Sequence, residues 1–122
     1  MPKRWNPASA WRYPRSKYGA QPETVDGVRF ASRKEARRYG DLRVLAKAGL
    51  IRDLQLQPEF PLAVADTRGI LQVIGIYRAD FSYVDRESDR FVVEDVKGFK
   101  TTLYRWKKKH VEVQYGITVR EV

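Results

Sequence analysis

The stretch that decides the fold is Phe91-Val92-Val93-Glu94-Asp95-Val96-Lys97-Gly98. It has the pattern of a buried β-strand that carries an acid and a lysine two residues apart and then stops at a glycine. Because side chains alternate between the faces of a strand, Asp95 and Lys97 share one face and Glu94 lies on the other. Charged groups at the end of an apolar strand are costly to desolvate unless they meet partners, a metal ion or a substrate. This stretch is therefore the first place to look for chemistry.

The preceding segment predicts the neighbouring strand. Residues 70–83 have the composition of a strand, and residues 85–89 form a polar turn that leads into the stretch above. A symmetric hairpin then places Asp80 directly opposite Asp95, with Cβ atoms about 5 Å apart. Two carboxylates at that separation repel by roughly 3 kcal/mol at an effective dielectric constant of 20. A proton, Lys97 or a divalent cation can offset this repulsion.

Further upstream, the sequence predicts a helix and another strand. Ser32 opens the helix, apolar residues follow at three- and four-residue spacing, and Gly49 ends it. Residues 54–64 have apolar side chains at even positions, which is typical of a strand with one buried face. The turn at residues 66–69 connects this strand to the one at residues 70–83.

Downstream, Thr101 or Thr102 caps a second helix that ends at Gly116, and residues 117–122 form a last strand. Helical spacing predicts a buried apolar face on this helix, formed by Leu103, Trp106, His110 and Val113. The order of elements is α-β-β-β-α-β. This order predicts an α/β fold with a mixed four-stranded sheet flanked by helices.

Composition limits the class of protein. The 122 residues fit one domain, and the formal net charge of +9 suggests a polyanionic partner, with nucleic acid first and a merely soluble basic protein as the plain alternative. Cysteine is absent, which excludes disulfides and cysteine-ligated zinc. No apolar run approaches the roughly 18 residues of a membrane span. We expect a soluble cytoplasmic protein without a membrane partner, in the host cytoplasm if a phage encodes it.

A basic arm, residues 1–22, precedes the domain expected over residues 23–122. It mixes lysine and arginine with aromatic residues, has no acids and is broken by four prolines. The arm can lie along phosphates with its aromatic side chains on bases, or pack in part on the domain.

The acidic pair has the chemistry of a site for a hard cation. Asp80, the Asp95 side chain and the carbonyl oxygen of Val96 can supply oxygens to Mg²⁺ and leave positions for water and phosphate. Lys97 can orient the water or stabilise charge on the phosphate. Glu35, in the first turn of the first helix, is either a further ligand or only a capping-box residue.

Each candidate also has a plain structural interpretation. Asp95 and Lys97 can be an ordinary ion pair, worth about 0 to 1 kcal/mol if exposed, and Asp80 can pair with Arg78. His110 is expected to be a packed core residue. Six positions are candidate contacts to phosphates, with a solvated helix face as the default: Lys100, Arg105, Lys108, Lys109, Arg33 and Arg37.

Together these residues resemble the PD-(D/E)XK nuclease superfamily. The resemblance rests on Glu35, Ala79-Asp80 and Glu94-Asp95-Val96-Lys97. Residues 25–122 are similar to a small phage and prophage family of formerly unknown function within that superfamily. Alanine stands at the first proline of the motif, and of the two adjacent acids only Asp95 stands two residues before Lys97.

The resemblance implies a restriction-endonuclease-like core and a Mg²⁺-dependent DNA endonuclease, with Mn²⁺ as a substitute metal. Its catalytic residues would be Glu35, Asp80, Asp95 and Lys97. Such a hydrolase would act in phage DNA processing, recombination or the resolution of branched DNA such as Holliday junctions, and a homodimer would suit paired cuts. The alternative is a non-catalytic DNA-binding protein, or an accessory subunit of a phage replication or packaging complex, with the same fold.

Overall fold

The computed structural model describes residues 22–122. These residues fall into two compact units, 22–40 and 41–122, and the division between them lies inside helix α2. The basic arm expected over residues 1–22 lies, apart from its last residue, outside the described part of the chain. None of the helices within residues 22–122 is long and apolar enough to cross a membrane.

The first unit holds a short hairpin followed by the beginning of α2. Strands β1 (Glu23–Val25) and β2 (Val28–Phe30) pair antiparallel around Asp26 and Gly27. Both turn residues have positive φ, 51° and 76°, as this two-residue hairpin turn requires. After the turn, the rings of Phe30 and Tyr39 pack with their centroids 4.9 Å apart.

Helix α2 (Arg33–Lys47) begins and ends where the sequence predicts. The Ser32 hydroxyl accepts a hydrogen bond of 3.1 Å from the Glu35 N–H and so caps the first turn. Gly49 has a φ of 76°, a left-handed conformation that ends a helix without strain in glycine. The predicted apolar face is confirmed, because it holds the buried residues Ala36, Tyr39 and Leu42.

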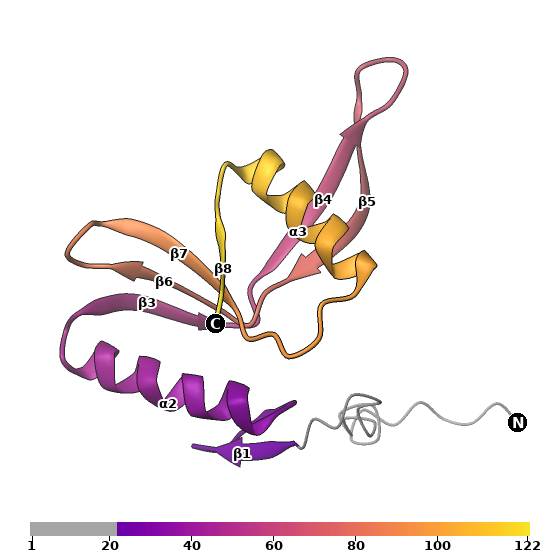
Figure 1. Cartoon of the computed structure of the whole chain (residues 1–122). Helices are drawn as coiled ribbons and strands as arrows, with labels where there is room; N and C mark the ends of the chain where they lie inside the picture. The colour runs from indigo at the N-terminus through magenta and orange to yellow at the C-terminus, as the bar shows by residue number, and fades with distance from the viewer. Residues whose placement is uncertain (1–21) are drawn as a thin grey trace, which may run out of the picture. The chain divides into compact units, whose positions relative to one another are not determined.

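The second unit is built on a mixed four-stranded sheet, as predicted. Its strands, in their order across the sheet, are β3 (Ile51–Leu56), β6 (Phe81–Asp85), β7 (Arg90–Asp95) and β8 (Val119–Glu121). β3 pairs antiparallel with β6, and β6 with β7, whereas β8 runs parallel to β7 (Figure 1). The predicted register of the β6–β7 hairpin is confirmed in five pairs, which begin with Phe81 opposite Glu94.

The two long strands expected at residues 54–64 and 70–83 are each divided in two. The parts nearer the turn are β4 (Glu59–Ala65) and β5 (Leu71–Arg78), which form a separate two-stranded sheet. Pro58 has no N–H to donate, so the ladder of the larger sheet cannot continue unchanged through it. The sequence pattern, in which Pro58 and Pro61 indicate an edge position or a bulge, predicted one strand in each segment, and the structure corrects this to two.

The hairpin nevertheless keeps its register across the interruption. Leu56 pairs with Phe81 on one side of it, and on the other side Glu59 pairs with Arg78, three residues later along one strand and three residues earlier along the other. Two backbone hydrogen bonds bridge the gap, from the Gln57 N–H to the Asp80 carbonyl at 2.9 Å and from the Ala79 N–H to the Pro58 carbonyl at 3.1 Å. Asp80 is thus held at the point where the chain passes from one sheet to the other.

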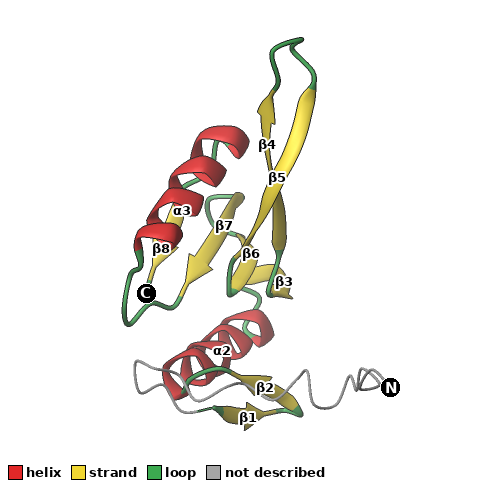
Figure 2. Cartoon of the chain, turned by 90° about the vertical axis from the view of Figure 1, so that its right-hand side faces the viewer, coloured by secondary structure: helices red, strands yellow, loops and turns green. Residues whose placement is uncertain are grey.

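Helix α3 (Thr102–Tyr115) lies alongside the β4–β5 hairpin (Figure 2). Its caps are the predicted ones: the Thr101 hydroxyl accepts a hydrogen bond from the Tyr104 N–H, and Gly116 is left-handed. The predicted buried face, however, is wrong. Three of its four residues are more than half exposed: Leu103 at 64%, Trp106 at 76% and Val113 at 73%.

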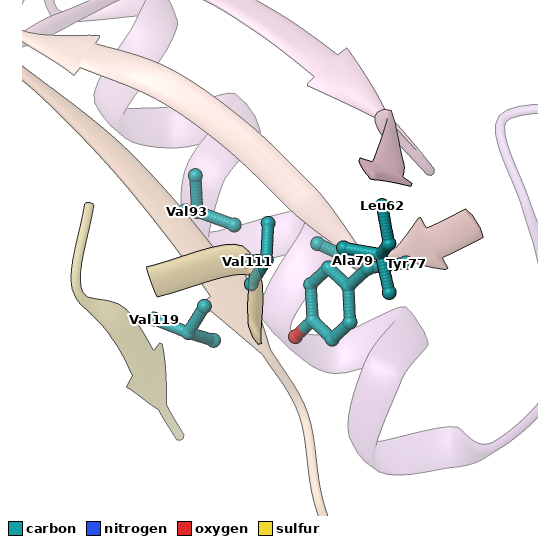
Figure 3. Close-up of a cluster of buried hydrophobic side chains, with 6 residues drawn as sticks. All are labelled: Leu62, Tyr77, Ala79, Val93, Val111 and Val119. Carbon is teal, nitrogen blue, oxygen red and sulfur yellow. The ribbon is translucent and has the colours of Figure 1, made fainter. Parts of the chain in front are cut away.

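The buried face of α3 is centred on Val111 instead. This side chain joins a core cluster with residues of the hairpin, the sheet and the link between them: Leu62, Tyr77, Ala79, Val93 and Val119 (Figure 3). Tyr104 and Lys108 of α3 bind Glu121 of β8. These polar contacts fix the orientation of the helix, so its most apolar stripe faces outward.

Candidate functional site

Asp80 lies directly before β6, in the interruption between β5 and β6. Its N–H donates to the Glu94 carbonyl at 3.1 Å, and its Oδ2 accepts the Val96 N–H at 2.7 Å. The regular ladder ends at the pair of Phe81 and Glu94, so the expected pairing of Asp80 with Asp95 is not part of it. The two hydrogen bonds instead hold Asp80 against the end of β7.

Asp95 is the last residue of β7, and its side chain is buried. The Tyr77 hydroxyl donates a hydrogen bond to its Oδ2. Its Oδ1 accepts no hydrogen bond from the described residues, and the Lys97 Nζ lies 3.5 Å away. A buried carboxylate oxygen without a donor is rare in folded proteins, and a hard cation would satisfy it. Asp95 and Lys97 are therefore not the exposed ion pair of the plain structural interpretation.

Burial dominates the electrostatics of both carboxyl groups. It raises the pKa of Asp95 to about 6, against the opposing positive charge of Lys97. It also raises the pKa of Asp80, although the Val96 N–H and the Lys97 charge favour the ionised form. Each group is therefore ionised at neutral pH only at a cost in free energy, and a bound cation would offset that cost.

Lys97 is held in place by an aromatic ring of α3. Its Nζ lies 4.4 Å from the centroid of the Tyr104 ring, a cation–π distance. The Tyr104 hydroxyl donates to Glu121 at 3.1 Å, and Glu121 also pairs with Lys108 at 2.9 Å and Lys100 at 3.4 Å. The hydrogen bond from Lys108 lowers the pKa of Glu121, which stays ionised. The ring over Lys97 is thus anchored to β8.

The neighbouring acid, Glu94, has a different set of partners. It is fully buried, accepts a hydrogen bond from the Tyr83 hydroxyl and forms an ion pair of 3.9 Å with Arg120. The alternation of side chains along β7 explains why these partners are not those of Asp95. Arg78, the alternative partner expected for Asp80, pairs with Glu59 at 2.6 Å.

The other predicted ligand, Glu35, is buried in the first turn of α2. It belongs to the unit of residues 22–40, whereas the two aspartates belong to residues 41–122, so its role as a further ligand stays a prediction. Arg33 and Arg37 are exposed on the same helix and stay candidate phosphate contacts. Within residues 22–122, no three histidine, cysteine or acidic side chains form a metal-binding cluster. Mg²⁺ is nevertheless commonly held by one or two carboxylates together with water and substrate phosphates, so the two aspartates fit it.

The remaining predicted phosphate contacts gather at α3. A cavity of about 350 Å³ is lined by seven residues: Lys100, Tyr104, Arg105, Lys108, Lys109, Glu112 and Glu121. The helix thus presents a basic cavity that shares Tyr104 with the surroundings of Lys97. His110, expected in the core, is half-buried, and its Nε2 lies 2.9 Å from the Ala63 carbonyl oxygen.

Three residues of this site were not predicted from the sequence. Tyr77 lies in the expected strand, but its pattern does not distinguish it from other buried aromatic residues. Tyr104 stands seven residues before Val111, a helical spacing that marks the true buried side of α3. Glu121 is opposite Asp95 in the parallel pairing of β7 with β8, a register that the sequence does not specify.

Comparison with known protein families identifies the family of this chain. No curated protein and no solved structure matches the chain. The family described as "Protein of unknown function (DUF1064)" matches residues 15–121, which include both aspartates, Lys97 and α3. The chain therefore belongs to this family of proteins of unknown function.

Proposed function

We propose that this chain is a Mg²⁺-dependent DNA endonuclease of the PD-(D/E)XK type, with Asp80 and Asp95 as metal ligands. The observation that carries the proposal is the buried Asp95 carboxyl group beside Lys97, together with the half-buried Asp80 carboxyl group, both with raised pKa values. An ion pair with Lys97 that only stabilised the fold would need one carboxylate. A second carboxylate, whose ionised form is destabilised by burial, would add little to the stability of the fold. The Oδ1 of Asp95, which has the Lys97 ammonium group at 3.5 Å but accepts no hydrogen bond from residues 22–122, supports a bound cation as a further partner.

The proposed reaction is hydrolysis of a phosphodiester bond. The oxygen of water bonds to phosphorus, the bond to the leaving oxygen breaks, and a proton goes to that oxygen. A bound Mg²⁺, or Mn²⁺ in its place, supplies a Lewis acid for the phosphate and lowers the pKa of water. Lys97 stabilises negative charge on the phosphate, and Tyr104 keeps the Lys97 ammonium group in place. The Val96 carbonyl and Glu35 are the further candidate ligands.

The proposed substrate follows from charge. The chain has a net charge of +9, and the basic cavity at α3 is lined by four cationic side chains. Phosphate contacts of this kind bind DNA of any sequence and weaken with salt. We include branched DNA among the substrates, and paired cuts on two strands would require a homodimer.

The test is incubation of the protein with supercoiled, linear and four-way-junction DNA in Mg²⁺, Mn²⁺ or EDTA. We expect cleavage only with a metal ion, and none with Asp80→Asn or Asp95→Asn. The matched control is Asp53→Asn, because Asp53 is an exposed acid that pairs with Arg52 on β3. Control and wild type should cleave equally.

DNA binding without cleavage of any of these substrates would refute the enzyme. The chain would then be a non-catalytic DNA-binding protein or an accessory subunit. Cleavage that survives both aspartate substitutions would instead show that the site has been assigned to the wrong residues.

A further inference from the structure

The outer face of α3 carries a large aromatic side chain in an open groove. Trp106 is 76% exposed. The groove has a volume of about 540 Å³ and is lined by Ala63, Trp106, Lys109, His110, Val113 and Gln114. Exposed apolar patches with a polar rim mark interaction surfaces, and here Ala63, Trp106 and Val113 lie beside Lys109, His110 and Gln114.

The floor of this groove is fixed by hydrogen bonds between α3 and β4. The Gln114 side chain accepts the Ala63 N–H at 2.9 Å and donates to the Pro61 carbonyl at 3.2 Å. The His110 ring contacts the Ala63 carbonyl at 2.9 Å. Helix and hairpin therefore form the groove without help from a ligand, and a ligand need not order them.

Positive charge borders the groove. Lys109 lines both the groove and the basic cavity, whose four cationic side chains outnumber its two acids, Glu112 and Glu121. From Lys97 to Lys109 the sequence has six basic residues and no acid. A second copy of this face would bring these lysines against each other, whereas a nucleic-acid strand brings phosphates to the cavity and bases to the groove.

We propose that Trp106 is a stacking platform for an unpaired base of DNA, while Lys109 and Arg105 contact the adjacent phosphates. The choice of DNA rests on the proposed function, but the stacking does not depend on cleavage. Every base has an apolar face, so stacking on tryptophan tolerates any sequence. Bases inside a duplex stack on each other and are not accessible. The groove therefore directs the protein to single-stranded segments and to the unpaired positions of branched DNA.

The experiment measures binding by fluorescence anisotropy with the full chain in EDTA, so that no cleavage contributes. Three labelled ligands are compared: a single strand of mixed sequence, the corresponding duplex and an abasic strand of the same length. Trp106→Ala should weaken binding of the single strand by roughly 5- to 150-fold and leave the other two ligands within about twofold. Trp106→Phe should retain most of the affinity. Leu103→Ala, which changes another exposed apolar side chain of α3 outside this groove, should leave the binding of all three ligands unchanged.

Two outcomes would overturn the proposal. One is an equal effect of Trp106→Ala on all three ligands, or no effect on the single strand. The other is unchanged DNA binding together with the conversion of a dimer to a monomer in sedimentation velocity, which would assign the face to a second copy. Neither outcome would refute the proposed endonuclease activity, which is tested by metal-dependent cleavage. Conversely, stacking on Trp106 without cleavage would refute the endonuclease alone.

Discussion

Substitution of Asp95 by asparagine is expected to stabilise the protein at pH 8 and to abolish DNA cleavage at the same time. The Asp95 carboxyl is buried, with the Tyr77 hydroxyl on one oxygen and Lys97 as the nearest charge. Asparagine has nearly the same size and can turn its oxygen toward the tyrosine. It has no charge to desolvate, so it removes the cost of ionising this position.

The magnitude follows from the pKa of Asp95, which is about 6 in the fold and 3.8 ordinarily. This difference corresponds to about 3 kcal/mol. The folded state binds the proton more tightly than the unfolded state, so the stability contributed by the protonated group is lost as pH rises from about 4 to about 6. At pH 4.5 the advantage of Asp95→Asn should therefore be only about 1 kcal/mol, and at pH 8 it should reach about 3 kcal/mol. In a chain of this length it corresponds to a Tm increase on the order of 10 °C.

The assay is urea unfolding of wild type and variant at pH 8 and pH 4.5, without metal. Asp85→Asn is the control, because a hydrogen bond from Ser88 lowers the pKa of Asp85 and its removal should bring no gain at pH 8. Saturating Mg²⁺ should raise the Tm of the wild type and not that of Asp95→Asn. The reasoning would be refuted if Asp95→Asn were less stable than wild type at pH 8, or if its gain in unfolding free energy were the same at both pH values.

Three other substitutions test separate parts of the site and its scaffold. Tyr104→Leu removes the ring over Lys97 and should lower kcat for cleavage by roughly 2- to 30-fold with KM unchanged. Tyr104→Phe keeps the ring and should keep kcat. If both variants lowered kcat equally in steady-state kinetics, the ring would not be what positions Lys97. Glu94→Gln breaks the ion pair with Arg120 and should lower the Tm while cleavage persists; lost cleavage at unchanged Tm would make Glu94 the catalytic acid. Gly116→Ala forces alanine to a φ of 67° and should cost about 1 kcal/mol in urea unfolding, and an unchanged midpoint would contradict this backbone argument.

Local rules predicted the ends of the helices and the register of the central hairpin. Ser32 and Thr101 cap their helices with side-chain oxygens, and Gly116 ends α3 in a left-handed conformation. These outcomes depend on a few neighbouring residues, which a sequence displays directly. The β6–β7 register depends on a short polar turn, and it places Phe81 opposite Glu94, as the symmetric hairpin predicts.

The failures all involve contacts between distant segments. The buried face of α3 is set by Tyr104 and Lys108, which bind Glu121, and a count of apolar side chains cannot detect such polar contacts. The interruption at Pro58 and Asp80 likewise requires both strands of the hairpin to leave the regular ladder at the same position. Sequence therefore predicted the acids of the candidate site, whereas their tyrosine and glutamate neighbours required the assembled fold.

Because the interrupted hairpin keeps one continuous register, insertions and deletions near Asp80 must involve an even number of residues. In β5, Ile74 is the extra residue of a bulge, since Leu62 pairs with Gly75 and Ala63 with Val73. Between this bulge and Asp80, an insertion or deletion of one residue would reverse the side on which every following side chain points, while a change of two would restore it. Loop variation on the turn side of the bulge is free of this rule. The hairpin tip can therefore be lengthened by any number of residues, whereas the segment next to Asp80 must be lengthened or shortened by two residues at a time.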